Sequence, residues 1–196
     1  MREILVNEFL SLDGVMQAPG SPDEDRRGGF DLGGWHMQFA DDEVIADALE
    51  TMKDSDGFLL GRRTYEIFAS YWPNASEDNP FTEPMNRLQK YVVSQTLDEV
   101  NWQNSTLLSG DTVEAVNELK AQPGRDIQVL GSGDLVRTLM THDLVDRYVL
   151  QIDPIVLGSG KRLFEPGVPT TELELVDIEK TVAGTVLLTY RPTEAV

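Results

Sequence analysis

Short apolar stretches alternate with segments of helical periodicity, and this alternation limits the fold more than any other feature of the sequence. Stretches rich in Val, Ile, Leu, Phe and Tyr predict strands at residues 3–12, 58–60, 91–93, 127–130, 148–152, 173–178 and 185–190. Apolar residues at helical spacing predict helices from residue 41, over 64–71, from residue 111 and over 135–140. The last two strands flank a turn at Ala183-Gly184. The pattern predicts an α/β fold with a mostly parallel central sheet, helices on both faces and a C-terminal antiparallel hairpin.

The length and composition predict a single domain over residues 1–196. A chain of 196 residues with 40% hydrophobic residues can bury one sizeable core. No apolar run approaches the roughly 20 residues that span a bilayer, and Glu3 and Glu8 lie within the first predicted strand. We therefore expect a soluble, cytoplasmic protein without a membrane segment. The absence of cysteine excludes disulfides, iron-sulfur clusters and thiolate zinc sites.

The charge of the chain is strongly negative. Its 34 acidic and 16 basic residues give a formal net charge of -18. This charge argues against nucleic acid or an anionic membrane surface as a partner. An acidic surface suits a high-salt cytoplasm, and it also occurs in ordinary acidic enzymes, so both interpretations stay open.

Small or hydrogen-bond-donating residues follow three of the predicted strands directly. These segments are Gly61-Arg62-Arg63-Thr64, Ser94-Gln95-Thr96 and Gly131-Ser132-Gly133. In a parallel sheet, ligands bind beyond the carboxyl ends of the strands, where helix N-termini present backbone N–H groups. Glycine lets the backbone approach a phosphate, Thr64 could cap its helix, and two arginines supply positive charge. The three segments together predict an anion-binding site, although the arginines could instead pair with surface carboxylates and Gly131-Ser132-Gly133 could be a tight turn.

Several common catalytic templates do not fit the sequence. The third glycine of a Rossmann fingerprint would fall at Val136, and the segment before Gly160-Lys161 lacks the first glycine and the final Ser/Thr of a P-loop. The two histidines, His36 and His142, offer little for a metal site or a serine hydrolase. His142 follows a predicted helix and suits its C-terminal dipole. His36 lies beside Trp35 in the long loop of residues 15–40, where it could contact a ligand, but we expect it to be a partly exposed loop residue.

The ordered set of motifs resembles the dihydrofolate-reductase-like family, and more closely the reductase (C-terminal) domain of riboflavin-biosynthesis deaminase-reductases and its stand-alone relatives. The matching motifs are Phe9-Leu10-Ser11-Leu12-Asp13-Gly14, Leu59-Leu60-Gly61-Arg62-Arg63-Thr64-Tyr65-Glu66, Val92-Val93-Ser94-Gln95-Thr96-Leu97, Val129-Leu130-Gly131-Ser132-Gly133 and Pro154-Ile155-Val156-Leu157-Gly158-Ser159-Gly160-Lys161-Arg162-Leu163-Phe164. The resemblance spans nearly the whole chain. It implies a dihydrofolate-reductase-like three-layer fold and a homodimer.

The resemblance also implies a reductase that uses NADPH, with NADH not excluded, on a small pyrimidine, pterin or carbonyl/imine substrate. The implied cofactor-binding residues are Gly61, Arg62, Arg63, Thr64, Ser94, Gln95, Gly131, Ser132, Gly133, Asp134 and Leu135. The implied substrate-binding residues are Asp13, Gly14, Trp35, Pro154, Gly158 and Gly160. Relatives often carry a basic residue at the position of Gln95 and arginine near Asp134, so the preference for the 2′-phosphate of NADPH is open.

The catalytic chemistry is less well marked in the sequence. Asp13 is a candidate for orienting or protonating the substrate, and its alternative role is to shape the Asp-Gly turn. Folate reductases hold the pterin with a carboxylate on the first helix, but Asp41, Asp42, Glu43 and Asp47 have no recognisable pterin-binding context. The deaminase half of the riboflavin-biosynthesis enzymes needs a cysteine-containing zinc motif, which this chain cannot provide because it has no cysteine. The alternative function is a dinucleotide-binding module without turnover, such as a redox sensor.

Overall fold

The computed structural model describes residues 1–193. The chain forms two compact units, and it passes from one to the other three times. Unit 1 holds residues 1–5 and 48–145, and unit 2 holds residues 6–47 and 146–196. The expectation of a single domain stays a prediction.

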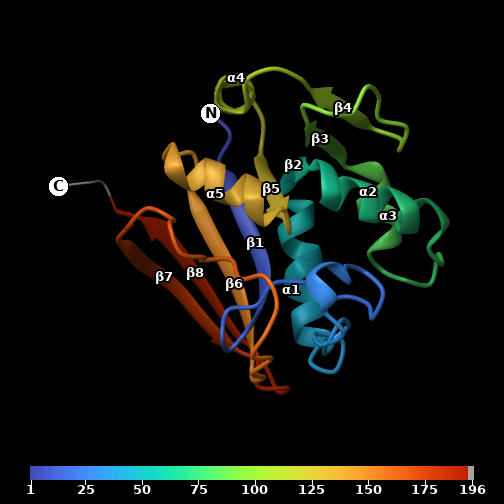
Figure 1. Ribbon diagram of the computed structural model, residues 1–196, viewed down its shortest axis with the longest axis vertical. Helices are drawn as coiled ribbons and strands as arrows, with labels where there is room; N and C mark the ends of the chain where they lie inside the picture. The colour runs from blue at the N-terminus through green and yellow to red at the C-terminus, as the bar shows by residue number, and fades with distance from the viewer. Residues whose placement is uncertain (194–196) are drawn as a thin grey trace. The chain divides into compact units, whose positions relative to one another are not determined.

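The strands and helices confirm the predicted α/β class (Figure 1). In order of hydrogen-bonded neighbours the eight strands are β4-β3-β2-β5-β1-β6-β8-β7. The pairs β2–β3, β2–β5 and β3–β4 are parallel, whereas β6–β8 and β7–β8 are antiparallel. The sheet is therefore mostly parallel and ends in the predicted C-terminal hairpin.

Unit 1 contains four parallel strands and the helices that connect them. Its elements are β2 (Ser55–Gly61), α2 (Arg62–Tyr71), the 3-10 helix Trp72–Asn74, α3 (Thr82–Arg87), β3 (Gln89–Val93), β4 (Ser105–Leu108), α4 (Thr112–Ala121), β5 (Asp126–Leu130) and α5 (Gly133–Thr141). Phe58, Leu60, Val92 and Trp102 lie in one of its hydrophobic clusters. The parallel register brings Gly61 opposite Val93, so the carboxyl ends of β2 and β3 lie at the same level.

One α-helix and one strand of unit 1 were not predicted. The prolines of residues 73–86 predict a loop, but the segment contains α3, whose Pro84 lies in the first turn, where a helix does not need the missing N–H. Strand β4 has four residues and lies at the end of the strand order, and its sequence shows no alternation. The sequence pattern did not reveal α3 because it contains a proline, and it did not reveal β4 because this edge strand is short.

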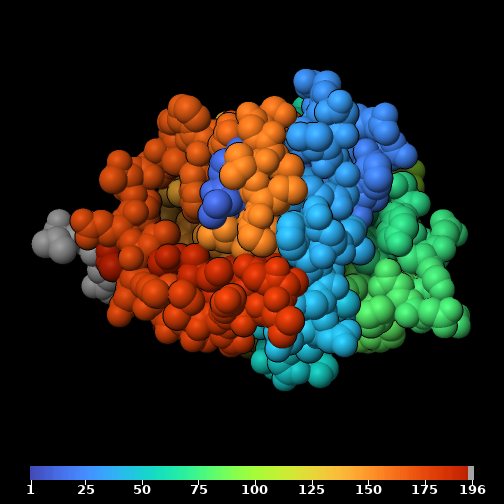
Figure 2. Space-filling view, turned by 90° about the horizontal axis from the view of Figure 1, so that it is seen from below, coloured from blue at the N-terminus to red at the C-terminus, as the bar shows by residue number. Residues whose placement is uncertain are grey.

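Unit 2 contains most of β1 (Ile4–Ser11), the 3-10 helix Arg27–Gly29, the first half of α1 (Asp42–Lys53) and the strands β6 (Arg147–Asp153), β7 (Leu173–Lys180) and β8 (Val186–Pro192). Asp41 caps α1 by accepting a hydrogen bond from the Val44 backbone N–H at 3.0 Å. The predicted hairpin turn is present, with Gly184 at φ +92°. Figure 2 shows the first part of α1 beside this turn, where the Ala183 N–H donates to Asp41 at 3.0 Å.

No helix in the described part of the chain is long and apolar enough to cross a membrane.

Candidate functional site

Two helices of unit 1 begin directly at the carboxyl ends of neighbouring parallel strands. Helix α2 follows β2 at Gly61, and α5 follows β5 after Gly131 and Ser132. Neither helix start has a side-chain cap, in contrast to α4, where Asp111 accepts from the Glu114 N–H at 2.9 Å. Uncapped first-turn N–H groups are donors for an anion. We call residues 61–64 and 131–135 the strand-end cluster.

Ser132 joins the two parts of the strand-end cluster. Its hydroxyl donates to Thr64 Oγ1 at 2.8 Å and accepts from the Gly61 N–H at 3.0 Å. The sequence suggested that Thr64 caps α2, and this prediction is wrong. Gly61 occupies the N-cap, and Thr64 lies inside the first turn. Gly131 has φ +57°, and an added Cβ there would lie 3.3 Å from the Thr64 side chain. The close approach of the two segments depends on this glycine.

The predicted arginines both face carboxylates. Arg62 donates to the two Glu66 oxygens at 2.9 and 3.1 Å, which is an ordinary i,i+4 pair on the surface of α2. Arg63 is 3.8 Å from Asp134, so its charge lies beside the start of α5. Asp134 alone would oppose an anion at that helix start, and Arg63 offsets its charge. The structure thus separates the two arginines, with Arg63 between the helix starts.

The third predicted segment, after β3, is used differently. The Ser94 hydroxyl accepts from the Thr96 and Leu97 backbone N–H groups at 3.1 and 3.0 Å, and its side chain is buried. Gln95 is exposed. Ser94 therefore shapes a turn, and the exposed Gln95 is the member of this segment that is open to a ligand.

The residues of the strand-end cluster fit the phosphates of a dinucleotide. Phosphate oxygens accept hydrogen bonds, and the two uncapped helix starts supply donors. Arg63 supplies charge, and Gly131 leaves room for the backbone to approach. A bound nicotinamide dinucleotide would bring hydride chemistry to the protein.

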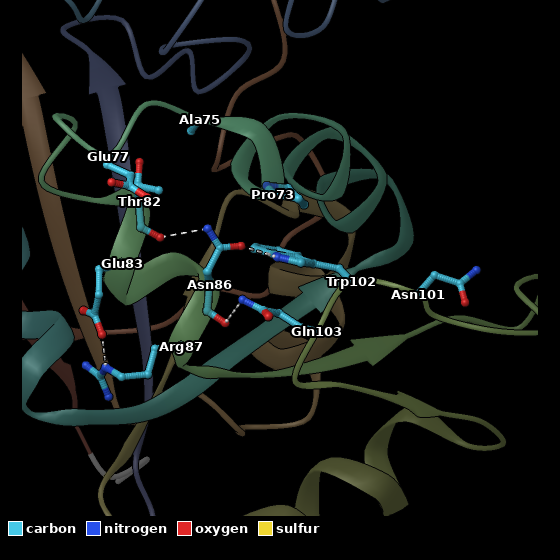
Figure 3. A pocket seen from close by; sticks show the side chains of 10 residues that line it. All are labelled: Pro73, Ala75, Glu77, Thr82, Glu83, Asn86, Arg87, Asn101, Trp102 and Gln103. Atoms are coloured by element: carbon cyan, nitrogen blue, oxygen red, sulfur yellow. Dashed lines mark hydrogen bonds and ion pairs between the residues drawn. The ribbon is translucent and has the colours of Figure 1, made fainter.

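A separate pocket of unit 1 is lined by none of the predicted site residues (Figure 3). It has a volume of about 720 Å³. It is lined by Pro73, Ala75, Glu77, Thr82, Glu83, Asn86, Arg87, Asn101, Trp102 and Gln103. Asn86 and Trp102 bond to each other across it, from the Trp102 indole N–H to Asn86 Oδ1 at 2.8 Å. The lining residues precede β3 and β4, so the pocket lies toward the amino ends of these strands, opposite to the strand-end cluster.

A fully buried lysine lies beside that pocket. Lys90 donates to the carbonyl oxygens of Met85 and Asn86 at 3.2 and 3.0 Å, and its Nζ lies 4.2 Å from the centre of the Trp102 ring. Burial lowers the pKa of Lys90 from 10.5 to about 8. The ammonium group satisfies the last carbonyl groups of α3, which is a structural role.

Asp13 in unit 2 is fully engaged by its own surroundings. Its carboxylate accepts from the Leu157 and Gly158 N–H groups at 3.0 and 2.9 Å, from the Ser11 hydroxyl at 2.8 Å and from Arg162 at 3.2 Å. These hydrogen bonds, that from Leu157 above all, hold the pKa of Asp13 well below its usual range despite the opposing effect of burial. An ionised, saturated carboxylate is no proton donor at neutral pH. The geometry favours the structural interpretation of Asp13.

The other predicted substrate residues are brought to the same region of unit 2. Gly158 is joined to Asp13, and Gly14 accepts from the Leu163 N–H at 3.2 Å. Gly160 has φ +114°, and a Cβ there would lie 2.7 Å from Val15. Two more residues complete the set. Trp35 is buried, with its indole N–H donating to Gln17 O at 2.8 Å, while Pro154 is exposed.

Sequence reasoning missed a buried polar group next to Trp35. His36 was expected to be partly exposed, but it is buried, because its ring stacks on Phe9 at 3.9 Å and its Nδ1 lies 2.8 Å from Asp153 Oδ2. The Thr185 hydroxyl donates to the other Asp153 oxygen at 2.7 Å. The position of Asp153 at the end of β6 was the available signal. By contrast, His142 is exposed at the C-cap of α5, where it was predicted.

These features define an α/β protein in which two uncapped helix starts lie at the carboxyl ends of neighbouring parallel strands. The sequence model of the RibD C-terminal domain family matches residues 2–187. The chain belongs to this family.

The protein YyaP of Bacillus subtilis strain 168 is 33% identical over 140 residues, which are 69% of this chain and 73% of YyaP. A solved protein from Shewanella sp. PV-4 with a riboflavin-biosynthesis name superposes with a TM-score of 0.71 at 22% identity, covering 98% of this chain and 99% of that one. A pyrimidine reductase-like protein from Corynebacterium diphtheriae gives a TM-score of 0.63 at 14% identity, with 99% and 93% covered. At these identities the two solved structures confirm the fold.

Proposed function

We propose that the protein is a reductase that uses a nicotinamide dinucleotide, NADPH with NADH as the alternative, to reduce a small organic substrate of pyrimidine, pterin or carbonyl/imine type. The strand-end cluster carries the proposal, because two uncapped helix starts joined by Ser132 offer donors for the cofactor phosphates. Family membership supports a reductase-type fold. Arg63 is the cation that we assign to the phosphates.

Calorimetry with NADPH and NADH, followed by cofactor consumption at 340 nm, tests this function. We expect micromolar or tighter binding of NADPH, and oxidation of the cofactor with at least one member of a panel of aldehydes, cyclic imines, aminopyrimidines and dihydropterins. Absence of heat with both cofactors would contradict the reductase. Binding without turnover across the panel would favour a redox sensor.

We also propose that the protein is a homodimer, joined through β7. This strand is last in the strand order, and its apolar side chains Leu175, Val176 and Ile178 are exposed. An edge strand with unpaired backbone groups and an apolar surface favours pairing with a second copy. Light scattering at micromolar concentration should give twice the monomer mass, and a monomer would overturn the proposal.

A further inference from the structure

Ser132 has a backbone conformation that serine rarely adopts. Its φ of +65° and ψ of +42° lie in the left-handed region, directly before α5. Glycine takes this conformation without steric cost, whereas a residue with a Cβ is strained there. Strained positions of this kind persist only where the surrounding structure holds them, and they are common at functional sites. Glycine would make this turn more easily, so the contacts of the Ser132 hydroxyl have to offset the strain.

The Ser132 hydroxyl lies in a chain of hydrogen-bonding groups that all belong to unit 1. Its oxygen accepts from the Gly61 N–H at 3.0 Å. Its single proton has two acceptors within reach, Thr64 Oγ1 at 2.8 Å and the Leu130 carbonyl oxygen at 3.3 Å. The shorter distance favours donation to Thr64. The chain therefore runs from the Gly61 N–H through Ser132 to Thr64.

This direction determines what the Thr64 hydroxyl can do. A hydroxyl group has one proton to donate. The Thr64 oxygen receives the proton of Ser132, and within residues 1–193 its own proton has no acceptor in the protein. Thr64 is only half-buried, so this proton is open to a molecule outside the protein. A donor at the end of a hydrogen-bonded chain is polarised by the groups before it, which strengthens its bond to an acceptor.

The Thr64 hydroxyl lies beside other open donors. Thr64 is the third residue of α2, whose first-turn N–H groups have no side-chain cap. The Gly61 N–H, in contrast, is already bonded to Ser132. Ser132 therefore takes one donor out of the strand-end cluster and sets the direction of another. A phosphate oxygen only accepts hydrogen bonds, and it matches such a set of donors.

We propose that Ser132 is a positioning residue, which orients the Thr64 hydroxyl as a donor to a cofactor phosphate without contacting the cofactor; this inference rests on the proposed function. Both hydrogen-bonding capacities of the Ser132 hydroxyl are used inside the protein, so its effect on binding runs through Thr64. The alternative is a serine that only stabilises a tight turn. The two interpretations differ in whether cofactor affinity follows the stability of the fold.

Two substitutions at residue 132 separate affinity from stability. Ser132→Gly removes the hydroxyl but relieves the left-handed backbone. We expect its NADPH Kd to rise about three- to tenfold, with a melting temperature close to that of wild type. Ser132→Thr keeps a hydroxyl but places a β-branched residue in the left-handed region. We expect a lower melting temperature and an NADPH Kd within about twofold of wild type.

A double-mutant cycle tests whether Ser132 acts through Thr64. Thr64→Val removes the hydroxyl at nearly constant volume, and it should raise the NADPH Kd about ten- to a hundredfold, because the lost bond is to a charged group. The double variant Ser132→Gly/Thr64→Val should bind as weakly as Thr64→Val alone, since the proton that Ser132 orients is already gone. Additive losses in the cycle would overturn the positioning role, because they would mean that Ser132 contacts the cofactor itself.

Asp143→Gly is the matched control. Asp143 is an exposed residue of unit 1 that has φ +54°, and it lies just after α5 and outside the strand-end cluster. This substitution relieves the same kind of backbone strain as Ser132→Gly, and it should leave the NADPH Kd unchanged. Melting curves are recorded for every variant, and the cycle with Ser132→Gly does not require Ser132→Thr to fold.

The outcomes distinguish this inference from the proposed function. A folded Ser132→Gly variant with the NADPH Kd of wild type would overturn the positioning role and leave the reductase standing. Weaker binding by Ser132→Thr in parallel with its loss of stability would make Ser132 a structural residue. If the wild type does not bind NADPH, the proposed function and the positioning role both fail.

Discussion

The two units use their polar groups in opposite ways. In unit 1 the strand-end cluster leaves first-turn N–H groups uncapped, and its arginines lie on the surface. In unit 2 the predicted loop residues bind one another, as Asp13 does with Leu157, Gly158 and Arg162. Uncapped backbone N–H groups can bind a ligand, whereas polar groups that already have hydrogen-bond partners stabilise the fold. Substitutions should therefore change affinity in the strand-end cluster and stability in unit 2.

The largest effect should come from Asp13→Asn. The amide cannot accept all four hydrogen bonds or pair with Arg162, so we expect a loss of about 2–4 kcal/mol in unfolding free energy at pH 7. Because the folded-state pKa of Asp13 is lowered, its contribution is present above the unfolded value near 4 and is lost as the pH falls below it. Urea unfolding should show a smaller difference in unfolding free energy between wild type and variant at pH 3 than at pH 7. An equal difference at both pH values would mean that the charge of Asp13 contributes little.

Lys90 gives a pH dependence of the same sign in unit 1, but in an alkaline pH window. Its folded-state pKa is lowered to about 8, so between pH 8 and 10.5 the folded state loses the proton before the unfolded state does. The unfolding free energy should therefore rise over this window, by up to about 3 kcal/mol from this group. Comparing wild type with Lys90→Met by urea unfolding isolates the effect, because other groups titrate alike in both. Parallel curves for the two proteins would contradict the lowered pKa.

Substitutions of Arg63 and Arg62 test whether the strand-end cluster binds the cofactor phosphates. Arg63→Ala should weaken NADPH binding by about 1.5–3 kcal/mol, or roughly ten- to a hundredfold, with little change in melting temperature. Arg62→Ala should have a smaller effect, because Arg62 is paired with Glu66 within α2. Arg87→Ala removes a similar surface pair, with Glu83, and serves as the control. Unchanged affinity together with a lowered melting temperature would make both arginines structural.

The sequence predicted what depends on local patterns. Gly61 and Gly131 mark strand ends that stand beside each other, and the parallel sheet follows from the alternation of strands with helices. The sequence did not predict the buried contacts of Asp153 with His36 and Thr185, because these residues are up to 149 positions apart and meet only through tertiary packing. Nor could the sequence show that the Asp13 carboxylate already has hydrogen-bond donors on both oxygens, since these donors include residues 157–162.

The smallest effect should come from the charge of the chain. A net charge of -18 predicts that molar KCl raises the melting temperature by screening repulsion. Asp47 is a local example in unit 2, because burial, and then the charges of Glu179 and Asp177, raise its pKa. A carboxyl whose folded-state pKa is raised destabilises the fold when it is ionised, so Asp47→Asn should raise the unfolding free energy at neutral pH. The exposed Asp98→Asn is the control for net charge. Since burial is the larger cause, the gain from Asp47→Asn should shrink in molar KCl but persist, and its complete loss in salt would show that repulsion dominates.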